Sequence, residues 1–537
     1  MNAGGKTATK ARSLRQAMSD LHIWVGLLPG WILYAMFLTG TVSYFRDELS
    51  QWMRPELPAY TAVGQGPVVA GRLTSAMREI APRASAWSIG MPNERTNVAA
   101  VSWLSASTFQ SADLNPVTGE RLTVRQTRGG DFFYAFHYQF HYMPRHVGRL
   151  LAGLCGMFML VAIISGVIVH KKIFTDFFTF RWGKGQGSWL DAHNALAVFG
   201  LPFHIMVTYS GLVILMQLYM PWGSAMAFET AAERQRLTAE IAPIVPPSKP
   251  RGEQVELANI ASMVRLAEAR WGQDQVGRLL ISNPDDAAAK VVVIRDEAGR
   301  ASNSPQYLLF DATGKLIRAK VRVGPAAEVH GVLYALHLGR FADYVTRWLY
   351  FLVSLAGTAM VGTGLVLWVV KRKQRLPDHE RPHVGLRLVE KLNIASIGGL
   401  SIAMAAFLWA NRLLPAHLPG RSAWEIHIFF IVWAVTFAHA LARPAKTAWI
   451  EQLWFGAAAL LLLPALGAAT TDRGLVSSLS ASDWVFVGVD LTLLALGGLH
   501  AWMAMAVLRH KPMRRRAKQE ASDDVAHQAN IRDVAAT

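Results

Sequence analysis

Eight apolar segments, separated by polar ones, set the pattern of the sequence. Each is long enough to cross a bilayer as a helix, which takes about 20 mainly apolar residues. The first follows a polar, basic stretch and lacks a small-residue cleavage site, so we interpret it as a retained anchor and not as a signal peptide. The predicted spans cover residues 23–45, 147–170, 190–218, 343–370, 392–410, 424–442, 448–469 and 484–508.

Two long polar segments interrupt this pattern, and each is large enough for a small folded domain. Both mix helical periodicity with extended runs that end in turn residues. In the first we expect a helix at 73–80, a strand at 98–102 and a hairpin from 109–114 and 120–124. In the second we expect a helix at 257–271, a strand at 291–295 and a hairpin from 307–310 and 315–319.

The predicted fold class is therefore mainly α: a polytopic membrane helical bundle of about eight spans with two α+β outer domains. The expected division is 1–46 for the N-terminus and first span, 47–146 for the first outer domain, 147–218 for spans two and three, 219–342 for the second outer domain, 343–375 for span four, 376–508 for a block of four further spans and 509–537 for a basic tail.

Composition agrees with a membrane protein. Hydrophobic residues make up 52% of the 537 positions and charged residues 17%, whereas ordinary soluble domains have about 25% charged residues. The net charge is +17, and the basic residues gather at alternate connections: before 23, within 171–184 and 371–375, at 443–446 and after 508. By the positive-inside rule both termini are cytoplasmic and the two long polar segments lie on the other side of the membrane. Membrane topology then explains where the basic residues lie, and a nucleic-acid partner is not needed to explain the positive net charge.

The single cysteine, Cys155, excludes an internal disulfide, a cysteine-rich zinc site and an iron–sulfur cluster. The sequence also has no nicotinamide- or flavin-binding fingerprint. If the protein carries electrons, we expect them to come from a partner protein or a quinone.

Residues 18–370 contain an internal repeat of span, outer domain and span. The distance from His22 to Gly40 is 18 residues, as is that from His193 to Gly211. The distances from Arg149 to Gly166 and from Arg347 to Gly364 are both 17 residues.

These residues resemble a known family, the PepSY-associated transmembrane helix proteins. The similar motifs are Ser165-Gly166-Val167-Ile168-Val169-His170, Trp189-Leu190-Asp191-Ala192-His193-Asn194 and Leu201-Pro202-Phe203-His204, and the resemblance covers residues 18–375. Members are associated with iron uptake, and some resemble haem-containing inner-membrane reductases of ferric siderophores. The resemblance implies PepSY-like outer domains and a haem-dependent ferric (siderophore) reductase.

Histidines at the span ends fit haem chemistry, because a b-type haem with two axial imidazoles needs paired histidines on facing helices. In a four-helix bundle the repeat pairs His22 with His193 near the cytoplasm and His141 with His337 near the periplasm. We therefore predict two haem b groups with these four histidines as axial ligands.

Alternatives stay open at each position. His170 can replace either cytoplasmic ligand, and His137 or His330 either periplasmic one. His204, 11 residues after His193, is a further ligand or a contact to a propionate. A third haem at His439 and His500 is a separate hypothesis, as is a homodimer.

The leading hypothesis is an inner-membrane haem protein that moves electrons outward to reduce a periplasmic ferric chelate such as a siderophore. One rival is a metal permease whose intramembrane histidines bind the ion. Another is a non-catalytic module whose PepSY-like domains bind or restrain other proteins.

Overall fold

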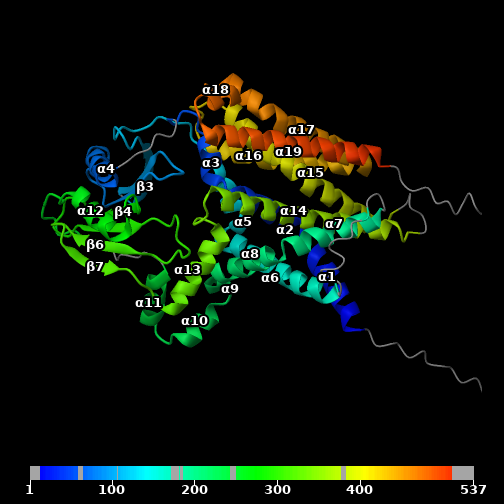
Figure 1. Ribbon diagram of the computed structural model, residues 1–537, viewed down its shortest axis with the longest axis horizontal. Coiled ribbons are helices and arrows are strands. Elements are labelled where there is room, and N and C mark those ends of the chain that lie inside the picture. The colour runs from blue at the N-terminus through cyan, green and yellow to red at the C-terminus, as the bar shows by residue number, and fades with distance from the viewer. Residues whose placement is uncertain are drawn as a thin grey trace, which may run out of the picture.

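The computed structural model describes residues 13–58, 65–105, 107–170, 181, 185–241, 249–376 and 382–510. A sheet covered by helices stands at one end of the molecule, and long helices form the rest (Figure 1). The described chain ends lie at the opposite end, where α1 (Leu14–Leu27) begins and α19 (Trp484–Arg509) stops. We call these the sheet end and the terminal end. The basic residues of 1–12, 171–180, 182–184 and 511–537 lie outside the described residues.

Six described helices are long and apolar enough to cross a membrane. Two further spans exist if each of two bent helix pairs counts as one, so the structure supports six to eight spans in the described residues. The six are α6 (Arg145–Val169), α14 (Tyr344–Lys373), α15 (Val384–Leu413), α16 (Arg421–Ala442), α17 (Ala445–Thr470) and α19. Each overlaps a predicted span.

The predicted spans 23–45 and 190–218 are each broken into two helices. α1 and α2 (Gly30–Ser43) meet at 63°, and α7 (Gln186–Phe199) and α8 (Leu201–Ile214) meet at 67°. Pro29 precedes α2, and Pro202 lies in the first turn of α8. Proline has no backbone N–H and clashes with the preceding turn, so both breaks have a local cause.

The two polar segments share one antiparallel sheet, in the order β3-β2-β1-β4-β5-β6-β7. The strands are β1 (Ala86–Gly90), β2 (Ala99–Ser105), β3 (Thr108–Leu114), β4 (Val276–Ser282), β5 (Lys290–Arg295), β6 (Tyr307–Asp311) and β7 (Leu316–Lys320). The two separate α+β domains expected from the sequence are thus corrected to one composite domain. β1 and β4 pair with each other along five residues, so neither is left as an unpaired edge.

Two helices cover one face of this sheet. α4 (Gly66–Ile80) and α12 (Ile260–Trp271) pack against each other and bury Leu73, Met77 and Val264 against the strands. The side chain of Arg78 on α4 forms an ion pair with Asp285 at 3.1 Å, which ties the two polar segments together. Both predicted helices are therefore present.

The predicted hairpins had different outcomes. The one at 307–310 and 315–319 is confirmed as β6 and β7. The one at 109–114 and 120–124 is wrong, because β3 pairs with β2 and only one bridge, Leu114 to Arg121, follows the turn. The partner of β3 is β2, which contains the strand expected at 98–102.

We expect the shared sheet to depend on its buried aromatic residues. Phe310 on β6 is 1% exposed, whereas Phe109 on β3 is 78% exposed. Phe310→Ala should destabilise the sheet domain by about 3–5 kcal/mol, the usual effect of removing a buried phenylalanine. Phe109→Ala is the matched control and should change the thermal unfolding of the purified protein little. Equal shifts for the two variants would contradict the burial.

The C-terminal helices α15 to α19 form a second bundle. Its sheet end is fixed by polar contacts with α3 (Arg46–Trp52), since Trp52 donates from Nε1 to Asp490 at 2.9 Å. The guanidinium of Arg412 stacks on the same Trp52 ring at 3.8 Å. The remaining helices are α5 (Gly129–Gln139), α9 (Met216–Tyr219), α10 (Pro221–Ala227), α11 (Ala231–Ile241), α13 (Pro325–Leu338) and α18 (Leu475–Ser480).

Candidate cofactor site: two histidine pairs

The first histidine pair joins α1 and α7 near the terminal end. The rings of His22 and His193 have their centres 6.2 Å apart, at 69° to each other. Nδ1 of His22 lies 2.9 Å from the Ala162 carbonyl, and Nδ1 of His193 lies 2.9 Å from the Met360 carbonyl. A carbonyl oxygen only accepts hydrogen bonds. In both neutral imidazoles Nδ1 therefore carries the proton, and Nε2 carries an unprotonated lone pair.

The second histidine pair joins α5 and α13 toward the sheet end. The rings of His137 and His337 have their centres 6.1 Å apart, at 40° to each other. Nδ1 of His137 donates to the Met36 carbonyl at 2.7 Å, and Nδ1 of His337 lies 3.0 Å from the Ser210 hydroxyl. As in the first pair, a neighbouring helix engages Nδ1 of each ring.

The second pair contains His137 where the sequence analysis placed His141. α5 ends at Gln139, and Phe140 takes a left-handed φ of 55°. His141 is therefore beyond the helix, and its ring stacks on Phe430 of α16 with centres 5.6 Å apart. His137 is on the helix itself, so it faces His337.

Each of the four rings packs against a glycine of a facing helix. The glycines and their rings are Gly166 with His22, Gly364 with His193, Gly40 with His137 and Gly211 with His337, and an added Cβ would lie 3.1, 3.1, 2.7 and 2.9 Å from the ring. The repeat found in the sequence thus preserves the contact between histidine and glycine in both halves.

A cavity of about 350 Å³ lies at the second pair. His137 and His337 line it together with Gly40 and Gly211. Four arginines also line it, Arg46, Arg95, Arg149 and Arg340, and no acidic residue is among the described lining residues. This arrangement suits an anionic ligand with a flat body.

Three of the arginines are partly neutralised. Arg46 lies 3.2 Å from Asp47, Arg95 lies 2.7 Å from Glu48, and Arg340 lies 2.6 Å from Glu297. Burial alone would lower the pKa of Arg340, but the Glu297 carboxylate raises it, so the guanidinium stays charged. The sequence analysis did not single out Arg46 or Arg95, because neither has a counterpart in the repeat.

Arg149 differs from these three. Its Nη2 donates to the Gln139 side chain at 3.2 Å, and its guanidinium lies 5.4 Å from the Tyr138 ring centre. Its Nε is buried and has no hydrogen-bond partner in the described part of the chain. An acceptor that enters the cavity could satisfy this donor.

The other predicted histidines lie around the pairs. His204 is 1% exposed, with its ring 6.2 Å from that of Phe37, and its buried Nε2 has no partner among the described residues. Nε2 of His170, at the end of α6, accepts a hydrogen bond from Nδ2 of Asn194 at 3.1 Å. His330 is on α13, two turns before His337, with its ring 6.1 Å from Tyr334.

The histidines proposed for a third haem are engaged separately. His439 uses both ring nitrogens, Nε2 with Glu451 at 2.8 Å and Nδ1 with Gln452 at 3.3 Å. His500 donates from Nδ1 to the Leu496 carbonyl. Because both ring nitrogens of His439 are engaged, neither is left to bind iron, and we propose no third haem site.

Among the described residues there is no group of three or more histidine, cysteine, aspartate or glutamate side chains that could hold a metal ion. A porphyrin supplies four nitrogens of its own, so an axial site needs only two protein ligands. A pair of histidines is therefore enough in number for an axial site.

We expect Gly211→Ala to disturb the second pair selectively. The new Cβ would lie 2.9 Å from Cε1 of His337, so the ring must move. Alanine favours a helix over glycine by about 1 kcal/mol, so a loss cannot come from helix propensity. Gly26→Ala, where no atom lies within 4 Å, is the control. Haem absorption of each purified variant measures the effect, and equal spectra would contradict the contact.

We expect Arg149→Gln to weaken haem retention at the second pair about tenfold. Hydrogen bonds to charged groups contribute about 1.5–3 kcal/mol, and the Arg149 donor awaits an acceptor. Arg145→Gln, on the exposed first turn of the same helix, is the control. Transfer of haem to an excess of an apo-globin acceptor measures retention. Equal transfer rates for the two variants would exclude Arg149 as a ligand contact.

The comparisons agree with this architecture. The family model described as the PepSY-associated TM region matches residues 19–371, so the chain belongs to that family. The sequence is also 26% identical over 379 residues to an uncharacterized protein of Pseudomonas aeruginosa. The aligned region covers 66% of this chain and 90% of the relative. Both histidine pairs lie within the family match, whereas α15 to α19 lie beyond it.

Proposed function

We propose that this membrane protein binds two haem b groups, one at each histidine pair, and moves electrons along the bundle to reduce a ferric chelate at the sheet end. The observation that carries the proposal is the geometry of the pairs. In both, two imidazoles on different helices face each other with centres 6.2 and 6.1 Å apart.

That separation fits axial ligation. A metal–imidazole bond is about 2 Å long. In a five-membered ring with bonds of about 1.3–1.4 Å the centre lies about 1.1 Å behind the nitrogen. Two imidazoles on opposite sides of one iron therefore have centres about 6.2 Å apart. Aromatic rings in direct contact have centres about 4.5–7 Å apart, so the separation is compatible with axial ligation and also with ordinary ring contact.

The chain's own groups orient the ligands. The Ala162, Met360 and Met36 carbonyls engage three of the Nδ1 atoms, so in the neutral imidazoles the proton is on Nδ1 and the lone pair on Nε2 can bind iron. The glycines leave room for these rings and for a flat macrocycle beside them. A b-type haem bound in this way supplies one-electron transfer.

The sheet end suits an anionic iron chelate. Arg46, Arg95 and Arg340 line the cavity at the second pair. Guanidinium groups bind carboxylates and similar oxygen anions in a bidentate manner. Adding an electron to the chelated Fe(III) gives Fe(II), which hard oxygen donors hold less strongly, so the iron is released.

The test is single-turnover reduction of ferric citrate and of a ferric hydroxamate by the full chain in detergent without oxygen. The protein is first reduced with dithionite, and excess reductant is removed. We expect haem absorption to return to the oxidised form as a ferrous indicator gains colour, one Fe(II) per electron. The Arg340→Gln chain should react more slowly with the same spectrum. A haem that stays reduced with both chelates would contradict ferric reduction.

A further inference from the structure

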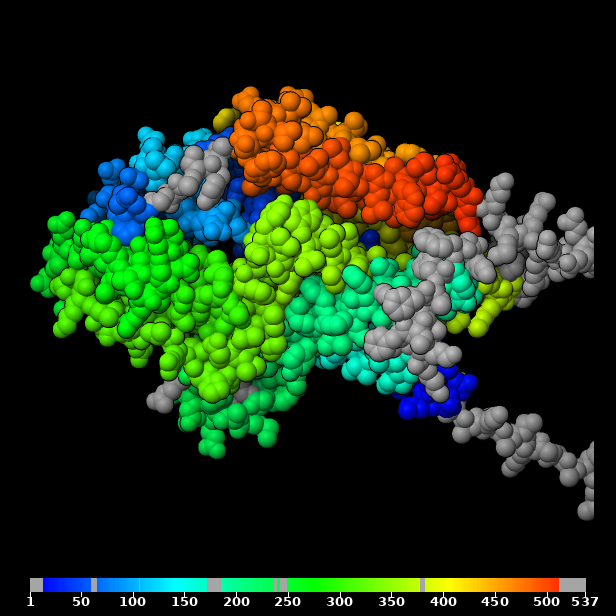
Figure 2. Space-filling view, viewed as in Figure 1, coloured from blue at the N-terminus to red at the C-terminus, as the bar shows by residue number. Residues whose placement is uncertain are grey.

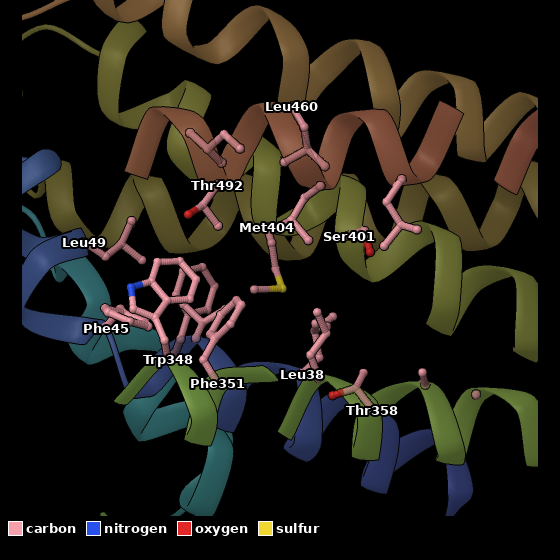
Figure 3. A pocket seen from close by; sticks show the side chains of 18 of the residues that line it. Leu38, Phe45, Leu49, Trp348, Phe351, Thr358, Ser401, Met404, Leu460 and Thr492 are labelled. Carbon is pink, nitrogen blue, oxygen red and sulfur yellow. The ribbon is translucent and has the colours of Figure 1, made fainter. Parts of the chain in front are cut away.

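A second, larger cavity separates the histidine-bearing helices from the C-terminal bundle. Its volume is about 2100 Å³. α2 and α14 form one wall, and α15, α17 and α19 form the other (Figure 3). A hollow between the green and the orange-red helices is visible on the molecular surface (Figure 2). Leu38, Phe351, Met404 and Leu460 point into the space, so it is lined mainly by apolar groups.

The cavity adjoins the first histidine pair. α7, which carries His193, contributes Leu196 to the lining. α14 contributes Ala359 and Thr363, the neighbours of Met360, whose carbonyl accepts the Nδ1 proton of His193. Only the wall of α14 and α7 therefore separates a molecule in the cavity from this pair.

A titratable side chain also lines the cavity. His500 of α19 lines it and is 8% exposed. Nδ1 of His500 lies 2.8 Å from the Leu496 carbonyl and must donate, so Nε2 is an acceptor. His500 is nine residues before the end of α19 at Arg509, and His193 is seven residues after the start of α7. At about 1.5 Å per residue, each lies about 10–14 Å along its own helix from that helix end.

We propose that this cavity binds a lipid-soluble quinol, which is the electron donor of the protein, with His500 as the proton acceptor. The proposal rests on the proposed function of the first histidine pair. One quinol loses two protons and two electrons and becomes a quinone. A ring hydroxyl gives its proton to Nε2 of His500, which releases it toward Glu390 and Lys373 at the terminal mouth before it takes the second.

The electrons leave one at a time. Each passes to the one-electron acceptor that His22 and His193 are proposed to hold, and each ends on one ferric ion. Two Fe(III) are therefore reduced to Fe(II) for each quinol oxidised, which balances the reaction.

The polar groups of the cavity favour a quinol over the acyl chains of a phospholipid. The Ser401 and Thr492 hydroxyls on one wall face the space (Figure 3). Thr358 lines the other wall, with its hydroxyl oxygen 3.3 Å from that of Thr41 on α2. Each already donates to a backbone carbonyl of its own helix, so its oxygen can accept a hydrogen bond. A quinol ring carries two hydroxyl donors, whereas an acyl chain has none. The apolar remainder of the cavity accommodates the isoprenoid tail.

One wall of the cavity comes from helices outside the family match, which ends at residue 371. The C-terminal bundle thus has a role that the histidine pairs alone do not need: it encloses the space beside α14.

The test uses two matched glycines of α19. Gly488 lines the cavity and Gly498 does not, and an added Cβ has no atom within 4 Å at either position. The full chain is placed in lipid nanodiscs, and decylubiquinol is added without oxygen. We expect Gly488→Phe to lower the rate of haem reduction at least about tenfold, while Gly498→Phe and reduction by dithionite stay unchanged. Equal rates for the two variants would overturn the proposal.

A binding measurement separates this proposal from the function of the pairs. A photoreactive azido-quinone should label peptides of α15 and α19 in the wild type and equally in a His22→Ala, His193→Ala chain. Gly488→Phe should abolish that labelling. If the haem spectrum is present but the azido-quinone labels neither helix, or a photoreactive phospholipid labels them and decylubiquinone does not compete, the quinol site is wrong and the proposed function stands.

His500→Gln tests the proton acceptor. Glutamine is similar in length but does not take up a proton near neutral pH. We expect azido-quinone labelling and the dithionite-reduced spectrum to stay as in the wild type, while reduction by decylubiquinol slows about tenfold or more. Unchanged quinol reduction would exclude His500 from the proton transfer.

Discussion

The His193→Ala chain is expected to lose one of two haem groups and to keep the other. His193 supplies one of the two facing imidazoles of the first pair, 6.2 Å from the ring of His22. Without it the site has one axial nitrogen, so low-spin ligation there ends. The second pair is on other helices, α5 and α13, and should be unaffected. Haem quantification and the low-temperature absorption spectrum of the purified chain measure the change.

His170→Ala is the matched control for this variant. His170 lies at the end of α6 and hydrogen-bonds Asn194, the residue after His193, so it is close to the site without facing His22. We expect it to retain both haem groups. If His170→Ala loses one haem and His193→Ala does not, the first pair is assigned to the wrong residue.

The second large effect is expected at the other pair, where neighbouring histidines give opposite results. His137→Ala should remove one haem, because the ring of His137 faces that of His337 at 6.1 Å. His141→Ala should keep both, because His141 packs on Phe430 of the C-terminal bundle. The measurement is the haem content of each chain together with the electron paramagnetic resonance signal of its low-spin ferric form.

The two variants change positions only four residues apart on the same segment. We therefore expect them to be expressed and inserted into the membrane equally well. A loss of haem in His141→Ala with a normal His137→Ala would support the pairing expected from the sequence alone. It would contradict the geometry of α5.

The first pair could be predicted from the sequence because the repeat fixes it. His22 and His193 each open a span and each precede a glycine by 18 residues. Helices of equal length in equivalent positions bring equivalent residues together, and the structure places these two ring centres 6.2 Å apart, in an edge-to-face arrangement. Their hydrogen bonds to Ala162 and Met360 could not be predicted, since they depend on how the helices pack.

The second pair could not be decided by spacing. His337 lies 10 residues before Arg347, whereas His141 and His137 lie 8 and 12 residues before Arg149, so each departs from the repeat by two residues. The position of the helix end decides between them. α5 stops before Phe140, and the buried Phe132, Phe133 and Phe136 fix the face that His137 adjoins. A helical interpretation of 129–139 was the missing signal.

The sheet was predicted only in part. The periodicity of 291–295 and of 307–319 identified β5, β6 and β7, but β1 and β4 were missed. These two strands join the halves of the sheet through pairs such as Trp87 with Ile281, almost 200 residues apart. Local patterns do not report such a partner. The sequence therefore predicted two separate domains where the chain forms one.

The central claim is tested most directly by the haem content and the oxidised-minus-reduced visible spectrum of the full chain, purified from haem-replete cells. We predict about two haem b per chain with sharp low-spin bands in both oxidation states. A chain that binds no haem under these conditions, or that binds it only in a high-spin form, would contradict the assignment of His22, His193, His137 and His337 as axial pairs.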